Sequence, residues 1–123
     1  MSLRPSILII DDEPDLRATL CDVLEDEGWH AVGAADGAEA LALLRQGLRP
    51  RLILLDLVMP GMDGWRFREA QAADPALASI PVILLCAEQH ARSAPIDVAM
   101  LLRKPVGIDE LTQTVQRFSA VAA

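Results

Sequence analysis

The segment that decides the fold is a short apolar run that ends in acidic residues. Residues 7–14 read ILIIDDEP, and residues 52–56 read LILLD. Both runs are uniformly apolar, as expected of strands that are covered on both faces of a parallel sheet. Pro14 suits the first turn of a helix, where its missing N–H costs nothing. We therefore expect two buried strands that deliver carboxylates to their carboxyl ends.

Strand-like and helix-like segments alternate along the rest of the chain. Further strands are expected at residues 30–34, 82–85 and 99–102. Apolar residues at helical spacing mark four helical faces: Leu16, Leu20, Val23 and Leu24; Ala38, Leu41 and Leu44; Trp65 and Phe67; Ile108, Leu111, Val115 and Phe118. Asp36 and Asp63 are the expected N-caps, and Gly28 and Asp74-Pro75 are the expected helix ends.

Five strands alternating with helices predict an α/β fold. We expect a flavodoxin-like, doubly wound, five-stranded parallel sheet of order 2-1-3-4-5, with helices on both faces and residues 1–123 in one domain. Ligands of such sheets bind beyond the carboxyl ends of the strands, where the strand order reverses. That point lies between strands 1 and 3, the two strands that end in aspartates.

The chain is acidic, which restricts its partners. Its formal net charge is −7, so we expect no direct nucleic-acid binding, which needs Lys and Arg, and no docking on anionic lipid. The apolar runs are too short to cross a bilayer. Cys21 and Cys86 have neither metal-type spacing nor that of a disulfide framework. These features indicate a reduced, cytoplasmic location.

Three carboxylates are predicted to meet at the carboxyl edge of the sheet: Asp11, Asp12 and Asp56. Carboxylates held together repel each other and raise their own pKa values unless a cation joins them. Oxygen ligands with room for water suit Mg²⁺, or Mn²⁺ in its place. Lys104, at the end of the fifth strand, faces the same crevice. Its point charge suits a phosphoryl oxygen or a carboxylate.

Each of these residues also has an ordinary structural interpretation. A single Asp after a strand is usually a helix cap, and Lys-Pro after a strand is usually a solvated turn. Cys86 alone is more often a buried small hydrophobe than a reactive thiol. The placement of the carboxylates and Lys104 at the ends of successive strands favours the phosphoryl-and-metal interpretation for them, and not for Cys86.

Taken together, these segments resemble the receiver domain of two-component response regulators over essentially the whole chain. The resemblance rests on residues 7–12, residues 52–56, the MPGMDG loop at 59–64, and Lys104-Pro105. It implies a signalling domain rather than an enzyme, one that catalyses only its own phosphorylation and dephosphorylation. Asp56 would accept a phosphoryl group from a phosphohistidine on a sensor histidine kinase or a phosphotransfer domain.

The resemblance also implies a metal-ligand set. Asp12 would bind Mg²⁺ directly and Asp11 partly through water. Asp56 and the backbone carbonyl of Val58 would be further ligands. This set agrees with the preference of Mg²⁺ for a few carboxylates together with water and phosphate oxygens.

Around the phosphoryl group the chain partly follows and partly departs from the family. Lys104 would contact the phosphoryl group, its bond to Pro105 is often cis in the family, and Ala87 keeps the expected small residue. Cys86, however, stands where the family has Thr or Ser, and Leu101 stands where it usually has Tyr or Phe. Both partners of the usual switch are therefore missing.

These departures predict an altered response to phosphorylation. A thiol is a weak hydrogen-bond donor, so we expect a receiver that can be phosphorylated but changes shape little by the usual route. The stretch 87–102 is also about one helical turn shorter than expected. We therefore expect a brief or distorted fourth helix on the face that family members use for dimers and outputs.

Other functions fit the sequence less well. A haloacid-dehalogenase-like phosphatase needs a second Asp where Val58 stands, and dinucleotide binding needs a glycine fingerprint. Flavin binding needs a Gly/Ser/Thr-rich phosphate loop after the first strand. The main alternative is a pseudo-receiver that binds partners independently of phosphorylation, against which the retained carboxylates speak. A downstream output domain, an output protein and a homodimer are open alternatives as further partners.

Overall fold

The chain forms a parallel sheet with helices on both faces. The computed structural model describes residues 5–57, 59, 61–87 and 98–122. Their strands and helices are β1 (Ser6–Ile10), α1 (Pro14–Asp26), β2 (His30–Ala34), α2 (Gly37–Arg45), β3 (Leu52–Asp56), α3 (Gly64–Ala73), β4 (Val82–Ala87), β5 (Met100–Lys104) and α5 (Ile108–Ala122). The sheet order is β2-β1-β3-β4-β5 and every neighbouring pair is parallel. The predicted fold and strand order are confirmed.

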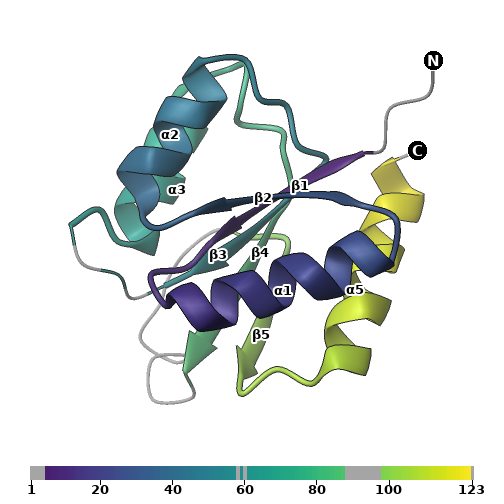
Figure 1. Cartoon of the computed structure of the whole chain (residues 1–123). Helices are drawn as coiled ribbons and strands as arrows, with labels where there is room; N and C mark the ends of the chain where they lie inside the picture. The colour runs from purple at the N-terminus through teal and green to yellow at the C-terminus, as the bar shows by residue number, and fades with distance from the viewer. Residues whose placement is uncertain (1–4, 58, 60, 88–97, 123) are drawn as a thin grey trace.

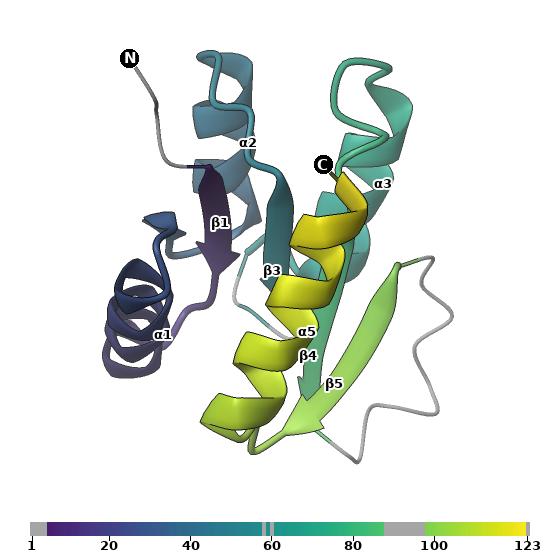
Figure 2. The ribbon, with the colours of Figure 1, turned by 90° about the vertical axis from the view of Figure 1, so that its right-hand side faces the viewer.

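Different helices cover the two faces of the sheet (Figure 1). α2 and α3 pack on one face, over a core cluster that contains Phe67 and Ile10. α1 and α5 pack on the other face, over a cluster that contains Leu24, Leu111 and Ile9. Figure 2 shows α5 crossing in front of the sheet and β5 at its edge. Successive strand residues point into opposite clusters, which explains why the central strands are apolar throughout.

The helix boundaries follow from local sequence. The side chains of Asp36 and Asp63 each accept a hydrogen bond from the N–H three residues later, at 2.9 Å and 3.0 Å, so both predicted N-caps are confirmed. α1 ends shortly before Gly28, whose φ of +98° is a conformation that other residues rarely adopt. α3 ends where Asp74 takes an extended backbone. Within the described ranges, no helix is long and apolar enough to cross a bilayer.

Two of the residues that mark the predicted helical faces are exposed. Ile108, grouped with Leu111, Val115 and Phe118, is 59% exposed. Ala38, grouped with Leu41 and Leu44, is also exposed. Both stand in the first turn of their helix, where a side chain tilts toward the helix N-terminus. The fourth helix was expected within residues 87–102, of which 88–97 lie outside the described residues.

The start of α3 packs directly on the backbone that follows β3. A β-carbon at Gly64 would lie 2.9 Å from the Cα of Leu57 and 3.1 Å from the carbonyl oxygen of Asp56. The Gly64 N–H also donates a hydrogen bond to the Leu57 carbonyl oxygen at 2.8 Å. A residue without a side chain is therefore needed for this close approach.

We expect Gly64→Ala to lower the free energy of unfolding by about 1–3 kcal/mol, because an inserted methyl group displaces backbone. Urea denaturation measures the change. Gly107→Ala is the matched control, since a β-carbon there meets nothing within 4 Å. Equal stability of Gly64→Ala and wild type would contradict the packing constraint.

Candidate functional site

The three predicted carboxylates meet beyond the carboxyl ends of β1 and β3. One carboxylate oxygen from each of Asp11, Asp12 and Asp56 lies within 4.8 Å of the others. β1 and β3 are neighbours in the sheet, so the residues that end them arrive side by side. Asp11 is fully buried and Asp56 is 6% exposed, whereas Asp12 is accessible to solvent. Two acidic groups are thus withdrawn from water beside a third that faces it.

Asp11 is held by its backbone as well as by its side chain. Its N–H donates to the Ala34 carbonyl oxygen at 3.1 Å, and its own carbonyl oxygen accepts from Arg17 Nη1 at 2.7 Å. Its Oδ1 accepts from the Glu13 N–H at 2.9 Å, and its Oδ2 accepts from Lys104 Nζ at 3.4 Å. Both carboxylate oxygens of Asp11 are therefore engaged within the protein.

Lys104 is the cation of the site. Its Nζ lies 3.2 Å from Asp56 Oδ1 and 3.4 Å from Asp11 Oδ2. Burial alone would lower the pKa of Lys104, but the carboxylates of Asp56 and Asp11 raise it above its ordinary value, so the ammonium is charged at neutral pH. The Lys104–Pro105 peptide bond is cis, the geometry that the resemblance implies.

The pKa of Asp56 reflects its burial as well as the charges around it. Burial is the main cause that raises the pKa of Asp56 from 3.8 to about 6. The charge of Lys104 opposes this increase, and the charge of Asp11 and a hydrogen bond with Asp12 add to it. Loss of hydration is therefore the main reason that the ionised form of Asp56 is disfavoured.

The donor set fits a divalent cation. One carboxylate oxygen of each of Asp11, Asp12 and Asp56 lies within 4.8 Å of the others, so the three ionised groups repel each other. A cation that binds oxygen ligands would relieve the repulsion. Carboxylate oxygens beside solvent, with space for water and phosphate oxygens, are the donors that Mg²⁺ uses, and Mn²⁺ accepts the same ligands.

Cys86 and Leu101 pack away from solvent near this site. Cys86 is 1% exposed, and its thiol donates to the Ala87 carbonyl oxygen at 3.2 Å. Burial, followed by the charge of Asp56, raises the pKa of the Cys86 thiol, so it is protonated at neutral pH. Cys86 belongs to the core cluster on the α2 and α3 face, and the half-buried Leu101 packs against that cluster. Both side chains contribute to packing.

Of the two remaining predicted positions, Ala87 stands beside the site and Val58 is not described. Ala87 is the register partner of Lys104, which places its backbone at the same sheet edge. Val58, whose carbonyl the resemblance makes a metal ligand, lies outside the described residues.

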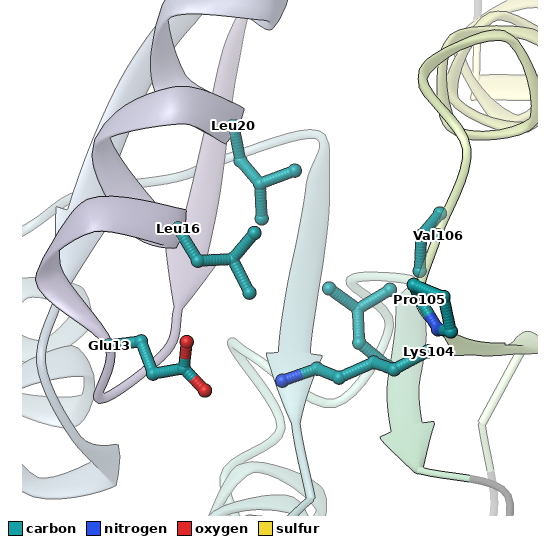
Figure 3. A pocket seen from close by; sticks show the side chains of 7 residues that line it. Glu13, Leu16, Leu20, Lys104, Pro105 and Val106 are labelled. Carbon is teal, nitrogen blue, oxygen red and sulfur yellow. The ribbon is translucent and has the colours of Figure 1, made fainter.

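A pocket of about 400 Å³ adjoins the site between α1 and the segment after β5 (Figure 3). Glu13 and Lys104 point toward one another across it, and apolar side chains form the rest of the lining: Leu16, Leu20, Leu85, Pro105 and Val106. Sequence reasoning missed this pocket, because the helical spacing of Leu16 and Leu20 indicates only a buried face. It also missed Arg17, whose contact with Asp11 depends on how α1 returns past the sheet.

We expect Asp56→Asn to stabilise the metal-free protein by about 1–2 kcal/mol at pH 7.5. The rise in the pKa of Asp56 to about 6 disfavours the ionised native state by at most about 3 kcal/mol, and partial solvation reduces this. Because the folded pKa is raised, the penalty is complete above about pH 6. It disappears as the pH falls toward 4.

Thermal unfolding of wild type and Asp56→Asn between pH 4 and 8 measures this difference. Asp22→Asn, which removes an exposed carboxylate from α1, is the control and should show no such pH dependence. A stability difference at pH 7.5 that persists at pH 4 would show that the charge of Asp56 is not its cause.

Comparison with known proteins identifies the family. The response regulator receiver domain family matches residues 7–116. The DNA-binding response regulator MtrA of Mycolicibacterium smegmatis is 39% identical over 87 residues, which cover 71% of this chain and 36% of that protein. The chain thus spans about a third of the length of that relative.

Solved structures agree with this match. The receiver domain of a signal transduction histidine kinase from Syntrophus aciditrophicus is 32% identical, with a TM-score of 0.86 over 94% of this chain and 90% of that chain. Response regulator TrrA from Thermotoga maritima, in complex with Mg²⁺–BeF, is 31% identical, with a TM-score of 0.82 over 93% of this chain and 98% of that chain. Because the family match covers most of its length, the chain belongs to the response regulator receiver domain family of two-component signalling.

Proposed function

We propose that Asp56 is the phosphoacceptor of this domain. The donor is a phosphohistidine on a sensor histidine kinase or a phosphotransfer domain. The observation that carries the proposal is the meeting of Asp56 with two further carboxylates and with Lys104, whose Nζ lies 3.2 Å from Asp56 Oδ1. A site that needed no phosphoryl group would have no use for a buried aspartate that is held beside both a cation and other acids.

Transfer of the phosphoryl group depends mainly on how the protein positions it against the Asp56 carboxylate, and less on chemical activation of that carboxylate. A carboxylate oxygen of Asp56 attacks phosphorus as the P–N bond of the phosphohistidine breaks, and the imidazole leaves with a proton from solvent. The product is an acyl phosphate on Asp56. Lys104 Nζ is placed to bind an equatorial phosphoryl oxygen, which stabilises charge in the transition state. Bound Mg²⁺ supplies further positive charge at those oxygens.

The three carboxylates would have different roles in holding Mg²⁺. Asp12 and Asp56 would bind it directly, and the resemblance adds the backbone carbonyl of Val58 as a further ligand. Asp11 would act partly through water, and its two carboxylate oxygens also accept hydrogen bonds from Glu13 and Lys104. Ala87 leaves space beside the phosphoryl group, as a small residue at the end of β4.

The signal passes to another part of the protein or to another protein. The relative MtrA is a DNA-binding response regulator of which the chain spans about a third, and the chain itself has a net charge of −7. A downstream output domain or protein, in the cytoplasm, is therefore the partner that fits. Residues 1–123 act as a single receiver domain that modifies itself and no separate substrate.

The phosphoacceptor role predicts one phosphoryl adduct by intact mass after incubation with acetyl phosphate and Mg²⁺. Asp56→Asn abolishes the adduct, because the attacking oxygen is replaced by an amide. Asp12→Asn slows its formation at limiting Mg²⁺, and chelation of Mg²⁺ prevents it. Asp22→Asn, on the exposed side of α1, should behave as wild type.

The opposite result is equally informative. Absence of an adduct with donor and Mg²⁺ in excess, together with no binding of beryllofluoride, would exclude phosphoacceptance. It would favour the phosphorylation-independent pseudo-receiver.

We also propose that phosphorylation changes the shape of this domain little through the two switch positions that Cys86 and Leu101 occupy. The Cys86 thiol is a weak donor that already contacts the Ala87 carbonyl oxygen. Leu101 has no polar group and already packs on the core cluster. Neither side chain gains a strong new hydrogen bond when a phosphoryl group is present.

Replacing the thiol by a hydroxyl tests this coupling. Cys86→Thr should enlarge the amide chemical-shift changes that beryllofluoride produces in residues 100–104, because its hydroxyl donates strongly to a phosphoryl oxygen. Cys86→Val is the matched control, because valine has the shape of threonine but no hydrogen-bond donor. Its response should stay near that of wild type. A large response of residues 100–104 in wild type, or equal responses in all three proteins, would contradict the proposal.

A further inference from the structure

Arg17 makes a contact that neither packing nor helix formation requires. Its Nη1 donates a hydrogen bond to the backbone carbonyl oxygen of Asp11 at 2.7 Å. This length is typical of hydrogen bonds from a charged donor. Because the accepting carbonyl belongs to the peptide unit that joins Asp11 to Asp12, Arg17 reaches from α1 to the backbone between two of the three clustered carboxylates.

Gly33 on β2 makes room for this side chain. A β-carbon at Gly33 would lie 3.1 Å from Arg17 Cδ and 3.3 Å from Arg17 Cγ. Gly33 is not among the described glycines that have a positive φ angle. Its backbone conformation therefore does not require glycine. The reason for a glycine here is space, because the stem of Arg17 lies directly over the strand.

The two peptide units on either side of the Asp11 Cα are therefore both held. The Asp11 N–H binds the Ala34 carbonyl oxygen on β2 at 3.1 Å, and the Asp11 carbonyl oxygen binds Arg17 on α1 at 2.7 Å. A planar peptide unit fixes the direction in which the next residue leaves. Asp12, which is accessible to solvent, depends on this unit for its place beside Asp56.

We infer that Arg17 is a positioning residue for the Mg²⁺ site, acting through the Asp11 carbonyl to hold Asp12 toward Asp56. This inference rests on the proposed function, because it concerns the same metal site. Geometry and charge predict opposite effects. The positive charge of Arg17 repels a cation, so a purely electrostatic role would make its removal tighten Mg²⁺ binding. A positioning role makes its removal weaken binding.

Calorimetric titration with Mg²⁺ distinguishes these effects. We expect Arg17→Ala to weaken Mg²⁺ binding by about 10-fold, the usual size of such supporting contacts. Gly33→Ala keeps the charge but displaces the stem, and should weaken binding by a smaller factor. Arg45→Ala, which removes an equal charge from the last turn of α2, is the control and should bind as wild type.

The double variant tests whether both residues act through one contact. With Ala at position 17, no stem remains to meet a new β-carbon at Gly33. The double variant Arg17→Ala/Gly33→Ala should therefore bind Mg²⁺ no more weakly than Arg17→Ala alone. Additive losses would show two unrelated effects and would overturn the shared contact.

A metal-free measurement provides a second readout. Hydrogen exchange at the Glu13 N–H, which donates to Asp11 Oδ1, should be faster in Arg17→Ala, while exchange in β3 stays unchanged. If Arg17→Ala does not fold, Gly33→Ala carries the same test with the charge retained.

The outcomes separate this inference from the proposed function. Mg²⁺ binding by wild type that Asp12→Asn weakens, with unchanged or tighter binding in Arg17→Ala, would overturn the role of Arg17 and leave the metal site standing. Absence of Mg²⁺ binding in wild type would overturn both.

Discussion

The parallel pairing of β1 with β3 is the constraint on which the rest of the structure depends. Both strands lie at the centre of the sheet with helices on either side, so their residues have to be apolar in both directions. The first polar residues after them then emerge at one edge, next to each other. The acidic cluster follows from this pairing, because no local interaction along the chain would bring Asp11 and Asp56 together.

The fold holds three carboxylates close together although their negative charges repel each other. Two carboxylates are withdrawn from water and a third lies beside them, while Lys104 supplies one positive charge. Burial is the main reason that the pKa of Asp56 rises to about 6, and the charge of Lys104 opposes this rise. A native state that carries this unfavourable charge is stabilised by anything that brings positive charge to the carboxylates. The same imbalance therefore makes the edge of the sheet receptive to a divalent cation and then to a phosphoryl group.

Local features were predictable because their causes are local. The N-caps at Asp36 and Asp63 and the end of α1 near Gly28 follow from hydrogen bonds and backbone preferences within a few residues. Strand order was predictable because parallel sheets of alternating elements allow few arrangements. The exposure of Ile108 was not predictable, because helical spacing identifies a face but not how far along the helix that face is covered.

The sequence by itself determined the parallel fold, the strands that end in aspartates, and the Lys-Pro pair that follows the last strand, because each is written in a short run of residues. Only the tertiary structure decided which polar atoms engage Asp11, how strongly the pKa of Asp56 rises, and that Arg17 crosses Gly33 to reach the backbone before Asp12. Lys104, Asp56 and Gly33 come from other segments of the chain than Asp11 and Arg17, and periodicity carries no information about the distances between such segments.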